Sequence, residues 1–475
     1  MSWLLVYIAV GWAIRLGMVP TVLRRQMAPG ASVAWLGIVF LHPYIGVVLY
    51  GLVGESRLGP RRAARSQQII ARIRDPQRHP GVMQHRADPD HGPSYQPMVQ
   101  QAEKISDMPV LGSNSVDFFD DTKAFVDKLV ADIAAAQQTV HLLYYIFFDD
   151  ETGRRVAEAV IDAARRGVKC RVIADAVASR RFFSISGLAP RLISGGVEVA
   201  AALPIAPFRR AFARMDLRNH RKLAIIDGQI AFAGSHNLIN ADYGGRRGNP
   251  WFDLTGRLRG PIVGELALVF AEDWEFETGK ELDIQPLEPT PDAKVLAQAV
   301  PTGPSNPDTT YRRLLLAAIQ CSRKELILTT PYFVPDEPTL LALSMAADRG
   351  VDVKLILPQV PDHIFTAAAG RAHFETLLRS GVGIYLYQPG LIHAKTATVD
   401  DAFCVFGSAN LDVRSFNLNF ELSICLYGDE ITNRLRDVQE SYLAHSKRLE
   451  SETWGQRGTL KVYTDRAITL LSPLL

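Results

Sequence analysis

The chain has 475 residues, of which 47% are hydrophobic and 21% are charged. This length exceeds one ordinary core, so we expect two or more domains of roughly 100–200 residues, and the composition excludes a disordered chain. The formal net charge of +2 disfavours a nucleic-acid-binding protein, which would more often carry a large basic excess.

Two long apolar segments begin the chain. Residues 3–23 are apolar apart from Arg15, and residues 33–53 are apolar apart from His42. Each segment is near the ~20 residues that span a bilayer as a helix. A cleaved signal peptide is the alternative, but the start lacks a basic region and a second apolar segment follows at once. We expect residues 1–54 to form a transmembrane hairpin, with Arg15 snorkelling or its segment lying partly in the interface.

Residues 55–108 have the composition of a basic linker, rich in Arg, Gln, Pro and His. We expect the histidines of this linker to be solvated. Its arginines outnumber those of the loop between the two apolar segments, which carries Arg24 and Arg25. The positive-inside rule therefore places everything after the second span in the cytoplasm, and predicts a multi-pass protein of the cell membrane.

The remainder of the chain is an internal repeat. Each half shows strand, helix, "RGV", strand, helix, "GV", strand, as in TVHLLYYIFFDD to GGVEVAAALP and in ELILTTPYFVPD to SGVGIYLYQP. Alternating strands and helices predict an α/β fold with a mostly parallel sheet flanked by helices in each half. The same order of elements in both halves favours duplication, with domains at residues 109–290 and 291–475 related by a pseudo-twofold axis.

Two motifs within the halves agree residue by residue. The first has His, Lys, Asp, Ser and Asn at offsets 0, 2, 7, 15 and 17, and the second has the same residue types at the same offsets. Chance agreement at five positions is remote. The members are His220, Lys222, Asp227, Ser235 and Asn237 in the first half, and His393, Lys395, Asp400, Ser408 and Asn410 in the second.

Each motif reads as a β-hairpin, because KLAIID and KTATVD end at a turn and QIAFAG and AFCVFG follow. Residues two apart in a strand share a face, so each His should point the same way as its Lys. Asp227 and Asp400 fall off that face, and we expect them to hold the turn. The returning Gly-Ser-x-Asn segment would bring a hydroxyl, an amide and backbone N–H groups beside the His and Lys, where they could hold an anion.

Folded together, the two motifs suit a phosphodiester. One imidazole would attack phosphorus, the other would protonate the leaving alkoxide, and the Lys and Asn groups would stabilise the charged oxygens. A nucleophilic imidazole needs an acceptor on its other nitrogen, and Asp253 and Glu421 are the candidates, each downstream of its own motif. No metal or other cofactor is required, and the four scattered cysteines form no CxxC pair.

The two HxKxxxxD…GSxN motifs resemble the signature of the phospholipase D superfamily. The segments "YYIFFDDETG", "TTPYFVPDEP", "GSANLDVRSFNLNFE" and the terminal "LSPLL" extend the similarity to bacterial cardiolipin synthases of the two-span type, over essentially the whole chain. One departure is Gly234-Ser235, where family members often have two glycines.

The resemblance implies a phosphatidyltransferase in which phosphatidylglycerol donates its phosphatidyl group to a histidine, glycerol leaves, and a second phosphatidylglycerol attacks to give cardiolipin. It implies catalytic roles for the His, Lys and Asp residues of both motifs, and phosphate binding by the Lys, Asn and Ser residues. His220 is our choice as nucleophile and His393 as general acid/base, with the reverse left open. Tyr145 and Tyr332 are candidates for the pocket wall, with core packing as the alternative.

Phosphatidylglycerol and other anionic membrane lipids are the expected partners, since a tethered active site meets its substrate within the leaflet. No nucleic-acid partner is expected, and a homo-oligomer is left open. Three other functions also stay open: a phospholipase D-type hydrolase or a transferase with another acceptor alcohol, a membrane-tethered nuclease, and an inactive lipid-binding scaffold. The sequence does not choose between transfer and hydrolysis, because that depends on how well the pocket excludes water.

Overall fold

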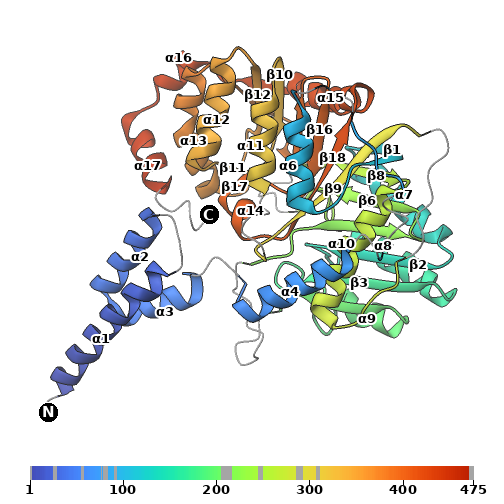
Figure 1. Ribbon diagram of the computed structural model, residues 1–475, viewed down its shortest axis with the longest axis horizontal. Coiled ribbons are helices and arrows are strands. Elements are labelled where there is room, and N and C mark those ends of the chain that lie inside the picture. The colour runs from blue at the N-terminus through green and yellow to red at the C-terminus, as the bar shows by residue number, and fades with distance from the viewer. Residues whose placement is uncertain are drawn as a thin grey trace.

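The computed structural model describes residues 3–24, 29–54, 58–75, 78, 84–89, 92, 94–204, 217–243, 250–284, 293–305 and 311–469. An α/β body and an N-terminal group of apolar helices make up this part of the chain (Figure 1). The body consists of two halves with the same order of elements, as the internal repeat predicts.

The first half has strands that alternate with helices up to β4 and then run as a meander. Its elements are β1 (Leu111–Phe119), α7 (Thr122–Ala135), β2 (Thr139–Tyr144), α8 (Glu151–Arg165), β3 (Lys169–Asp175), α9 (Leu188–Ser194), β4 (Glu198–Ala202), β5 (Lys222–Ile226), β6 (Ile230–Gly234), β7 (Trp251–Phe252), β8 (Thr255–Arg259) and α10 (Ile262–Thr278).

The second half repeats this order. Its elements are β9 (Val295–Thr302), α11 (Tyr311–Cys321), β10 (Glu325–Thr329), β11 (Phe333–Val334), α12 (Glu337–Asp348), β12 (Asp352–Pro358), α13 (Ile364–Arg379), β13 (Gly383–Tyr387), β14 (Leu391–Ile392), β15 (Thr396–Val399), β16 (Phe403–Gly407), β17 (Leu411–Asp412), α14 (Val413–Asn417), β18 (Glu421–Tyr427), α15 (Asp429–Ala444), β19 (Ser446–Arg448), α16 (Ser451–Gly455) and α17 (Thr459–Thr469).

The strand order reads the same from either side of the junction between the halves. From that junction the first half runs β1-β8-β6-β5-β2-β3-β4, and the second runs β9-β18-β16-β15-β10-β12-β13, with β19 at the outer edge. β1 and β9 join the two runs in antiparallel contact. Equivalent strands therefore occupy equivalent places, which is the pseudo-twofold arrangement that the sequence predicts.

The prediction of a mostly parallel sheet in each half is wrong for the described strands. Among the described strands, each half pairs β4-β3-β2 or β13-β12-β10 in parallel, and the other four neighbouring pairs of its seven strands are antiparallel. The reason lies in the connections. The helical crossovers give parallel neighbours, whereas the motif strands are joined by tight turns, which require antiparallel pairing.

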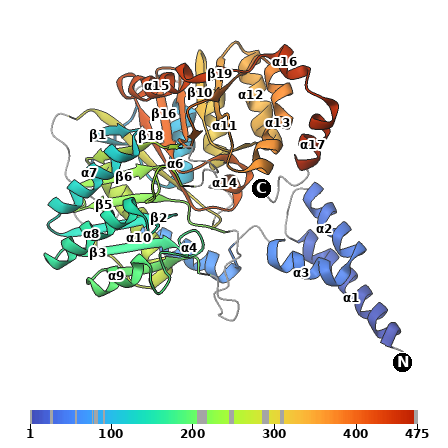
Figure 2. The same ribbon diagram turned by 180° about the vertical axis from the view of Figure 1, so that it is seen from behind.

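Helices cover the sheet and enclose three apolar clusters. α7 and α8 pack on the first half, and α11, α12 and α13 on the second (Figures 1 and 2). The third cluster is shared by both halves and includes Leu258 of β8, Trp274 of α10, Phe406 of β16 and Leu435 of α15. This shared core, together with the β1–β9 contact, holds the two halves as one body.

Of the described helices, α1 (Trp3–Leu23) is the one long and apolar enough to cross a membrane. The second predicted span is not one continuous helix: α2 (Pro29–Leu41) ends at Leu41, and α3 (Pro43–Val53) begins after His42. Pro43 explains the break, because proline lacks the N–H that a continuing helix would donate and disfavours helical backbone in the preceding residue. Arg15 Nε donates to the carbonyl oxygen of Phe40 at 2.9 Å, so this side chain joins α1 to α2.

The segment expected to be a linker contains two helices that pack on the body, α4 (Pro60–Ile73) and α6 (Gln96–Ser106). Arginines from α4 and its end pair with acidic residues of α10: Arg62 with Glu277, Arg72 with Glu275, and Arg74 with Glu272. These arginines therefore tie α4 to the first half rather than standing free.

Candidate active site

A pocket of about 570 Å³ lies where the two halves meet. It lies beyond the carboxyl ends of β2 and β10, the equivalent parallel strands next to the motif hairpins. Residues of both halves line it: Tyr145, Ile146, Arg218, His220, Asn237, Tyr243 and Trp251 from the first, and Tyr332, Asp362, His363, Thr366, His393, Asn410, Asp412, Arg414 and Asn419 from the second. The two predicted histidines thus share one pocket.

Each histidine segment is hydrogen-bonded to the opposite half. The backbone N–H of His220 donates to the carbonyl oxygen of Phe420 at 2.9 Å, and that of His393 donates to the carbonyl oxygen of Phe252 at 2.7 Å. Both histidines precede their motif strands, which begin at Lys222 and Thr396. The segments that these histidines contact are the ones that carry the two predicted orienting carboxylates.

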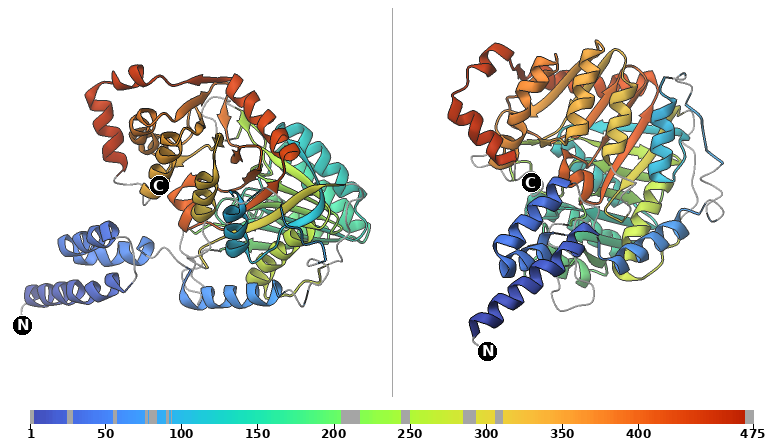
Figure 3. Two further views of the ribbon diagram at one scale, coloured as in Figure 1. Left: turned by 45° about the horizontal axis from the view of Figure 1, so that its top comes forward. Right: turned by 60° about the vertical axis from the view of Figure 1, so that its left-hand side comes forward.

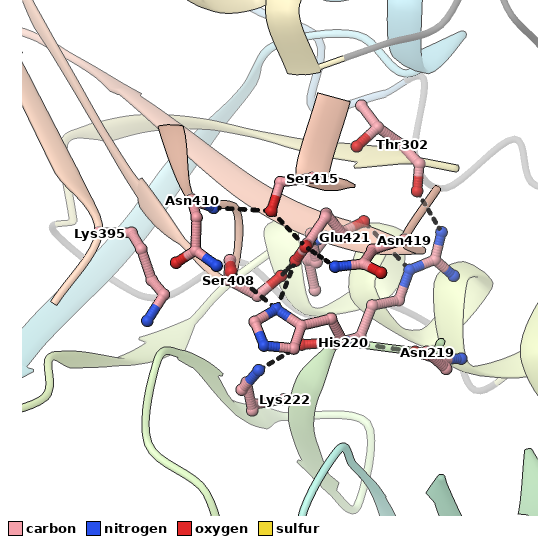
Figure 4. Close-up of polar contacts among 12 residues, drawn as sticks. Asn219, His220, Lys222, Thr302, Lys395, Ser408, Asn410, Ser415, Asn419 and Glu421 are labelled. Carbon is pink, nitrogen blue, oxygen red and sulfur yellow. Dashed lines mark hydrogen bonds and ion pairs between the residues drawn. The ribbon is translucent and has the colours of Figure 1, made fainter. Parts of the chain in front are cut away.

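The carboxylates consequently pair across the halves. His220 Nδ1 lies 3.0 Å from Glu421 Oε2 (Figure 4). His393 Nδ1 lies 2.5 Å from Asp253 Oδ1. Burial lowers the pKa of His220 to about 4 and of His393 to about 3, although each carboxylate opposes that shift. Both imidazoles are therefore neutral at pH 7, and the carboxylate fixes the proton on Nδ1, which leaves Nε2 for chemistry.

The two motif serines bind these carboxylates rather than lining the pocket. Ser235 Oγ donates to Asp253 at 2.6 Å, and Ser408 Oγ donates to Glu421 at 2.5 Å. The predicted role of the serines in phosphate binding does not fit this geometry, because a hydroxyl that donates to a buried carboxylate has no proton left for a phosphate. Each serine instead fixes the group that orients a histidine.

Glu421 receives further support from the segment that follows the second motif. Ser415 Oγ donates to Glu421 Oε1 at 3.0 Å, and Asn419 Nδ2 donates to the same oxygen at 3.1 Å (Figure 4). His220, the charge of Lys222 and the hydrogen bond from Ser408 hold the pKa of Glu421 below its usual range despite burial. The carboxylate therefore stays ionised and remains an acceptor for His220.

The two motif lysines are buried and lie beside their histidines. Lys222 Nζ donates to the carbonyl oxygen of His220 at 2.6 Å, and Lys395 Nζ donates to that of His393 at 2.5 Å. Burial lowers the pKa of both, that of Lys395 to about 8, and the charge of Lys395 lowers the pKa of Lys222 further. An anion between them would relieve that repulsion.

Asn237 and Asn410 line the pocket as predicted. Asn237 Nδ2 donates to the hydroxyl of Tyr243 at 2.9 Å, and its Oδ1 accepts from the backbone of Ile146 at 3.2 Å. Asn410 Oδ1 is buried without a hydrogen-bond partner. An unpaired buried amide is costly, so its side chain is suited to a ligand that completes it.

Asp227 and Asp400 hold the turns, as strand parity predicts, and do not line the pocket. Asp227 accepts from the backbone N–H groups of residues 137, 138 and 139, at 2.7 to 2.8 Å. Asp400 accepts from those of residues 323, 324 and 325, at 2.6 to 2.9 Å. Their φ angles of 52° and 50° place both in the left-handed region. A direct catalytic role for either Asp does not fit this position.

Tyr145 and Tyr332 both lie in the pocket wall. The Tyr145 ring packs edge-on against the His220 ring with centroids 4.6 Å apart, and Lys222 Nζ lies 5.1 Å from its centroid. The hydroxyl of Tyr332 donates to Asp362 at 2.6 Å.

Sequence reasoning missed several pocket residues. Arg218, two residues before His220, pairs with Asp175 at 3.2 Å. Trp251 packs against His393 with ring centroids 4.5 Å apart, and Arg414 joins the wall from α14. No local pattern singles these out. Within the described ranges, no group of three or more His, Cys, Asp or Glu side chains is placed to hold a metal ion.

Two histidines from two equivalent halves share one pocket, and this arrangement is that of a phospholipase D-like enzyme. Such an enzyme breaks one phosphodiester bond and transfers the phosphoryl-bearing group to a new acceptor. The family described as "Cardiolipin synthase, PLD-like domain" matches residues 129–249 and 315–442. Cardiolipin synthase A of Yersinia pseudotuberculosis and that of Yersinia pestis are each 34% identical to this chain, over 100% of it and 98% of the relative. The chain belongs to this cardiolipin synthase family, and it is a phosphatidyltransferase.

The fold is also that of a solved enzyme. The phosphatidylserine synthase of Haemophilus influenzae superposes with a TM-score of 0.60, over 80% of this chain and 100% of that chain, at 14% identity. At this level of identity the likeness concerns the fold.

Proposed function

We propose that this protein makes cardiolipin and glycerol from two molecules of phosphatidylglycerol. The observation that carries the proposal is the pair of neutral imidazoles in one pocket, each with Nδ1 bound to a carboxylate of the other half. That arrangement supplies one nucleophile and one proton carrier, which is what a two-step phosphodiester exchange requires.

The first step transfers the phosphatidyl group to the protein. Nε2 of His220 attacks phosphorus, the bond from phosphorus to the glycerol oxygen breaks, and glycerol leaves with a proton from His393. Burial lowers the pKa of His393, and a bound phosphate anion raises it again, which favours the protonated form that the step needs.

The second step reverses these roles. His393 accepts the proton of a glycerol hydroxyl of the second phosphatidylglycerol, whose oxygen attacks the phosphorus and releases His220. Lys222, Lys395, Asn237 and Asn410 stabilise the charge on the phosphate oxygens in both steps. The near-symmetry of the halves is compatible with the reverse assignment of the two histidines, and trapping of the labelled intermediate in single His variants distinguishes the two.

The test is an assay of the purified full-length protein with phosphatidylglycerol as the sole lipid substrate. The expected products are cardiolipin and free glycerol in equal amounts, with neither formed by His220→Ala or His393→Ala. Phosphatidic acid without cardiolipin would contradict the proposal and indicate a hydrolase.

The proposed location is the bacterial inner membrane, with both halves in the cytoplasm and the N-terminal helices embedded. The apolar helix α1 supports membrane association, and α2 with α3 would form a second, bent pass. Protease protection in inverted and right-side-out vesicles tests the orientation: cleavage of the body from the outer face of the cell would overturn it.

A further inference from the structure

Exposed large apolar side chains gather on two loops of the body. Ile185 is 98% exposed in the loop between β3 and α9, which also exposes Val177. In the second half, Val360 is 52%, Ile364 61% and Phe365 60% exposed, in the loop after β12 and the first turn of α13. We call these five residues the apolar rim.

The two loops are equivalent and flank the pocket. β3 and β12 occupy the same place in their halves, so the loops that follow them leave the same edge of the sheet, where the pocket lies. In the second half, Asp362, His363 and Thr366 line the pocket and alternate with rim residues along the chain. The rim in this half is therefore the outer side of the pocket wall.

The loop of the first half is also fixed to the pocket wall. Ser179 Oγ donates to the carbonyl oxygen of Tyr145 and accepts from the backbone N–H of Phe147, both at 2.9 Å. Phe182 stacks on Phe147 with ring centroids 4.6 Å apart. The exposed Ile185 thus projects from an anchored loop, and its exposure has no packing role within the described body.

Basic side chains accompany the apolar ones. Arg180 and Arg181 are exposed in the same loop as Ile185. Apolar residues beside cationic ones suit the interface of an anionic bilayer, where the former enter the headgroup region and the latter meet lipid phosphates.

The side of the body with α13, α14 and α17 faces the N-terminal helices (Figures 1 and 3). α17 lies along α13 and exposes Leu460 and Tyr463. A membrane that holds α1 therefore lies on this side of the body.

We propose that the apolar rim docks on the anionic leaflet and seats the pocket at the bilayer surface. Resting on the proposed function, this lets a phospholipid headgroup reach both histidines while its acyl chains stay in the membrane. The rim is then a second membrane contact in addition to the N-terminal helices.

Depth-dependent quenching tests the contact without relying on activity. The variants Ile185→Cys and Phe365→Cys carry an environment-sensitive fluorophore, and Met345→Cys on α12, where Met345 is 50% exposed, is the matched control. The native cysteines are buried. In full-length protein reconstituted in vesicles of phosphatidylcholine and phosphatidylglycerol with brominated acyl chains, we expect about twofold quenching at 185 and 365 and little at 345, since interfacial side chains reach roughly 5–10 Å below the headgroups. Equal quenching at all three positions, or none at 185 and 365, overturns the proposal.

Activity gives the second readout. The variant Ile185→Ser/Phe365→Ser should lose about tenfold in kcat/KM on phosphatidylglycerol in vesicles, because two apolar side chains no longer enter the interface. It should keep normal kcat/KM on short-chain phosphatidylglycerol dispersed in detergent, and Leu341→Ser/Met345→Ser should be normal on both. An equal loss on both substrates overturns the docking role. Absence of cardiolipin from every variant and from the parent would refute the proposed function but leave the quenching result intact.

Discussion

Lys395 shows how one residue sets the pH range of the site. It is buried beside His393, as Lys222 is beside His220, and burial lowers its pKa to about 8. A lysine with a lowered pKa is charged below that value and neutral above it, so its attraction for a phosphate is lost as pH rises through about 8. The histidines titrate at about 4 and 3 and stay neutral over this range.

We therefore predict that kcat/KM falls above pH 8. The pH dependence of kcat/KM reports the free enzyme, whereas that of kcat reports the enzyme with bound substrate. Because the bound phosphate favours the charged ammonium group, kcat should begin to fall at a higher pH than kcat/KM. Lys395→Arg should move the kcat/KM limb to higher pH, since arginine stays protonated, until Lys222, whose pKa is also lowered, loses its charge. Initial rates from pH 6 to pH 10.5 measure both, and a flat kcat/KM profile in the parent would rule out this assignment.

The carboxylates make a second prediction at this scale. Glu421→Gln and Asp253→Asn replace an anionic acceptor by an amide that no longer holds the proton on Nδ1, so we expect kcat to fall by roughly 10²–10⁴-fold. Glu325→Gln, which removes a carboxylate paired with Lys354 away from the pocket, is the control and should retain kcat. Near-normal turnover in both site variants would show that neither carboxylate orients a histidine.

Much of this residue chemistry could be predicted from the sequence, because spacing reports which side chains share a strand face. The lysines and asparagines were found from the spacing shared by the two motifs, and the position of Asp227 followed from parity. Asp253 and Glu421 were found because each imidazole needs an acceptor on its other nitrogen. The crossed pairing of Glu421 with His220 could not be predicted, since it depends on how the halves pack. The serines were misassigned because their acceptors lie on that same packed interface.

At the scale of elements, the motif hairpin is held by its aspartate. Asp227 and Asp400 each collect three backbone N–H groups from the segment before β2 or β10. They thereby dock the hairpin onto the neighbouring parallel strand, which carries the tyrosine or the "PYF" segment of the pocket. In both motifs the Asp lies seven residues after the His, because one strand and the start of its turn separate them.

Asp400→Ala should leave buried N–H groups without an acceptor and destabilise the protein by roughly 1–3 kcal/mol, since each lost acceptor exposes a desolvation cost. We expect a lower midpoint of thermal inactivation with kcat of the surviving enzyme within about twofold, because the carboxylate lies outside the pocket. Asp401→Ala changes the exposed neighbour and is the matched control. A large loss of kcat at unchanged thermal stability would instead favour a catalytic role.

The elements also show the limit of pattern reading. The predicted alternation of strands and helices is confirmed from β2 to β4 and from β10 to β13, and the two motif hairpins were predicted from their turns. Combining them into one mixed sheet required knowing that β8 and β18 return beside β6 and β16, which no local signal contains. The break at Pro43 was visible in the sequence, but hydropathy alone does not register it.

At the scale of the whole molecule, the halves are fitted closely at the shared core. A Cβ on Gly256 of β8 would lie 2.6 Å from the Phe406 ring of β16, closer than atoms can approach. Phe406 also packs edge-on against Phe118, so it has little freedom to move away.

Gly256→Ala should therefore push the halves apart, destabilise the protein by roughly 1–3 kcal/mol, and lower the rate of cardiolipin formation. Adding Phe406→Leu should restore part of the stability and part of the rate, because it removes the ring atoms that clash with the new Cβ. Gly458→Ala, at a site with nothing within 4 Å, is the control. If Phe406→Leu worsened Gly256→Ala, the clash would not be the cause.

The crossed pairing also has a consequence for how the enzyme comes into being on the ribosome. His220 and Glu421 are 201 residues apart in the chain, and His393 and Asp253 are 140 apart. A nascent chain therefore has no carboxylate for its first histidine until residue 421 of 475 has been synthesised. On the proposed function, a chain released before that point could not attack membrane phospholipids.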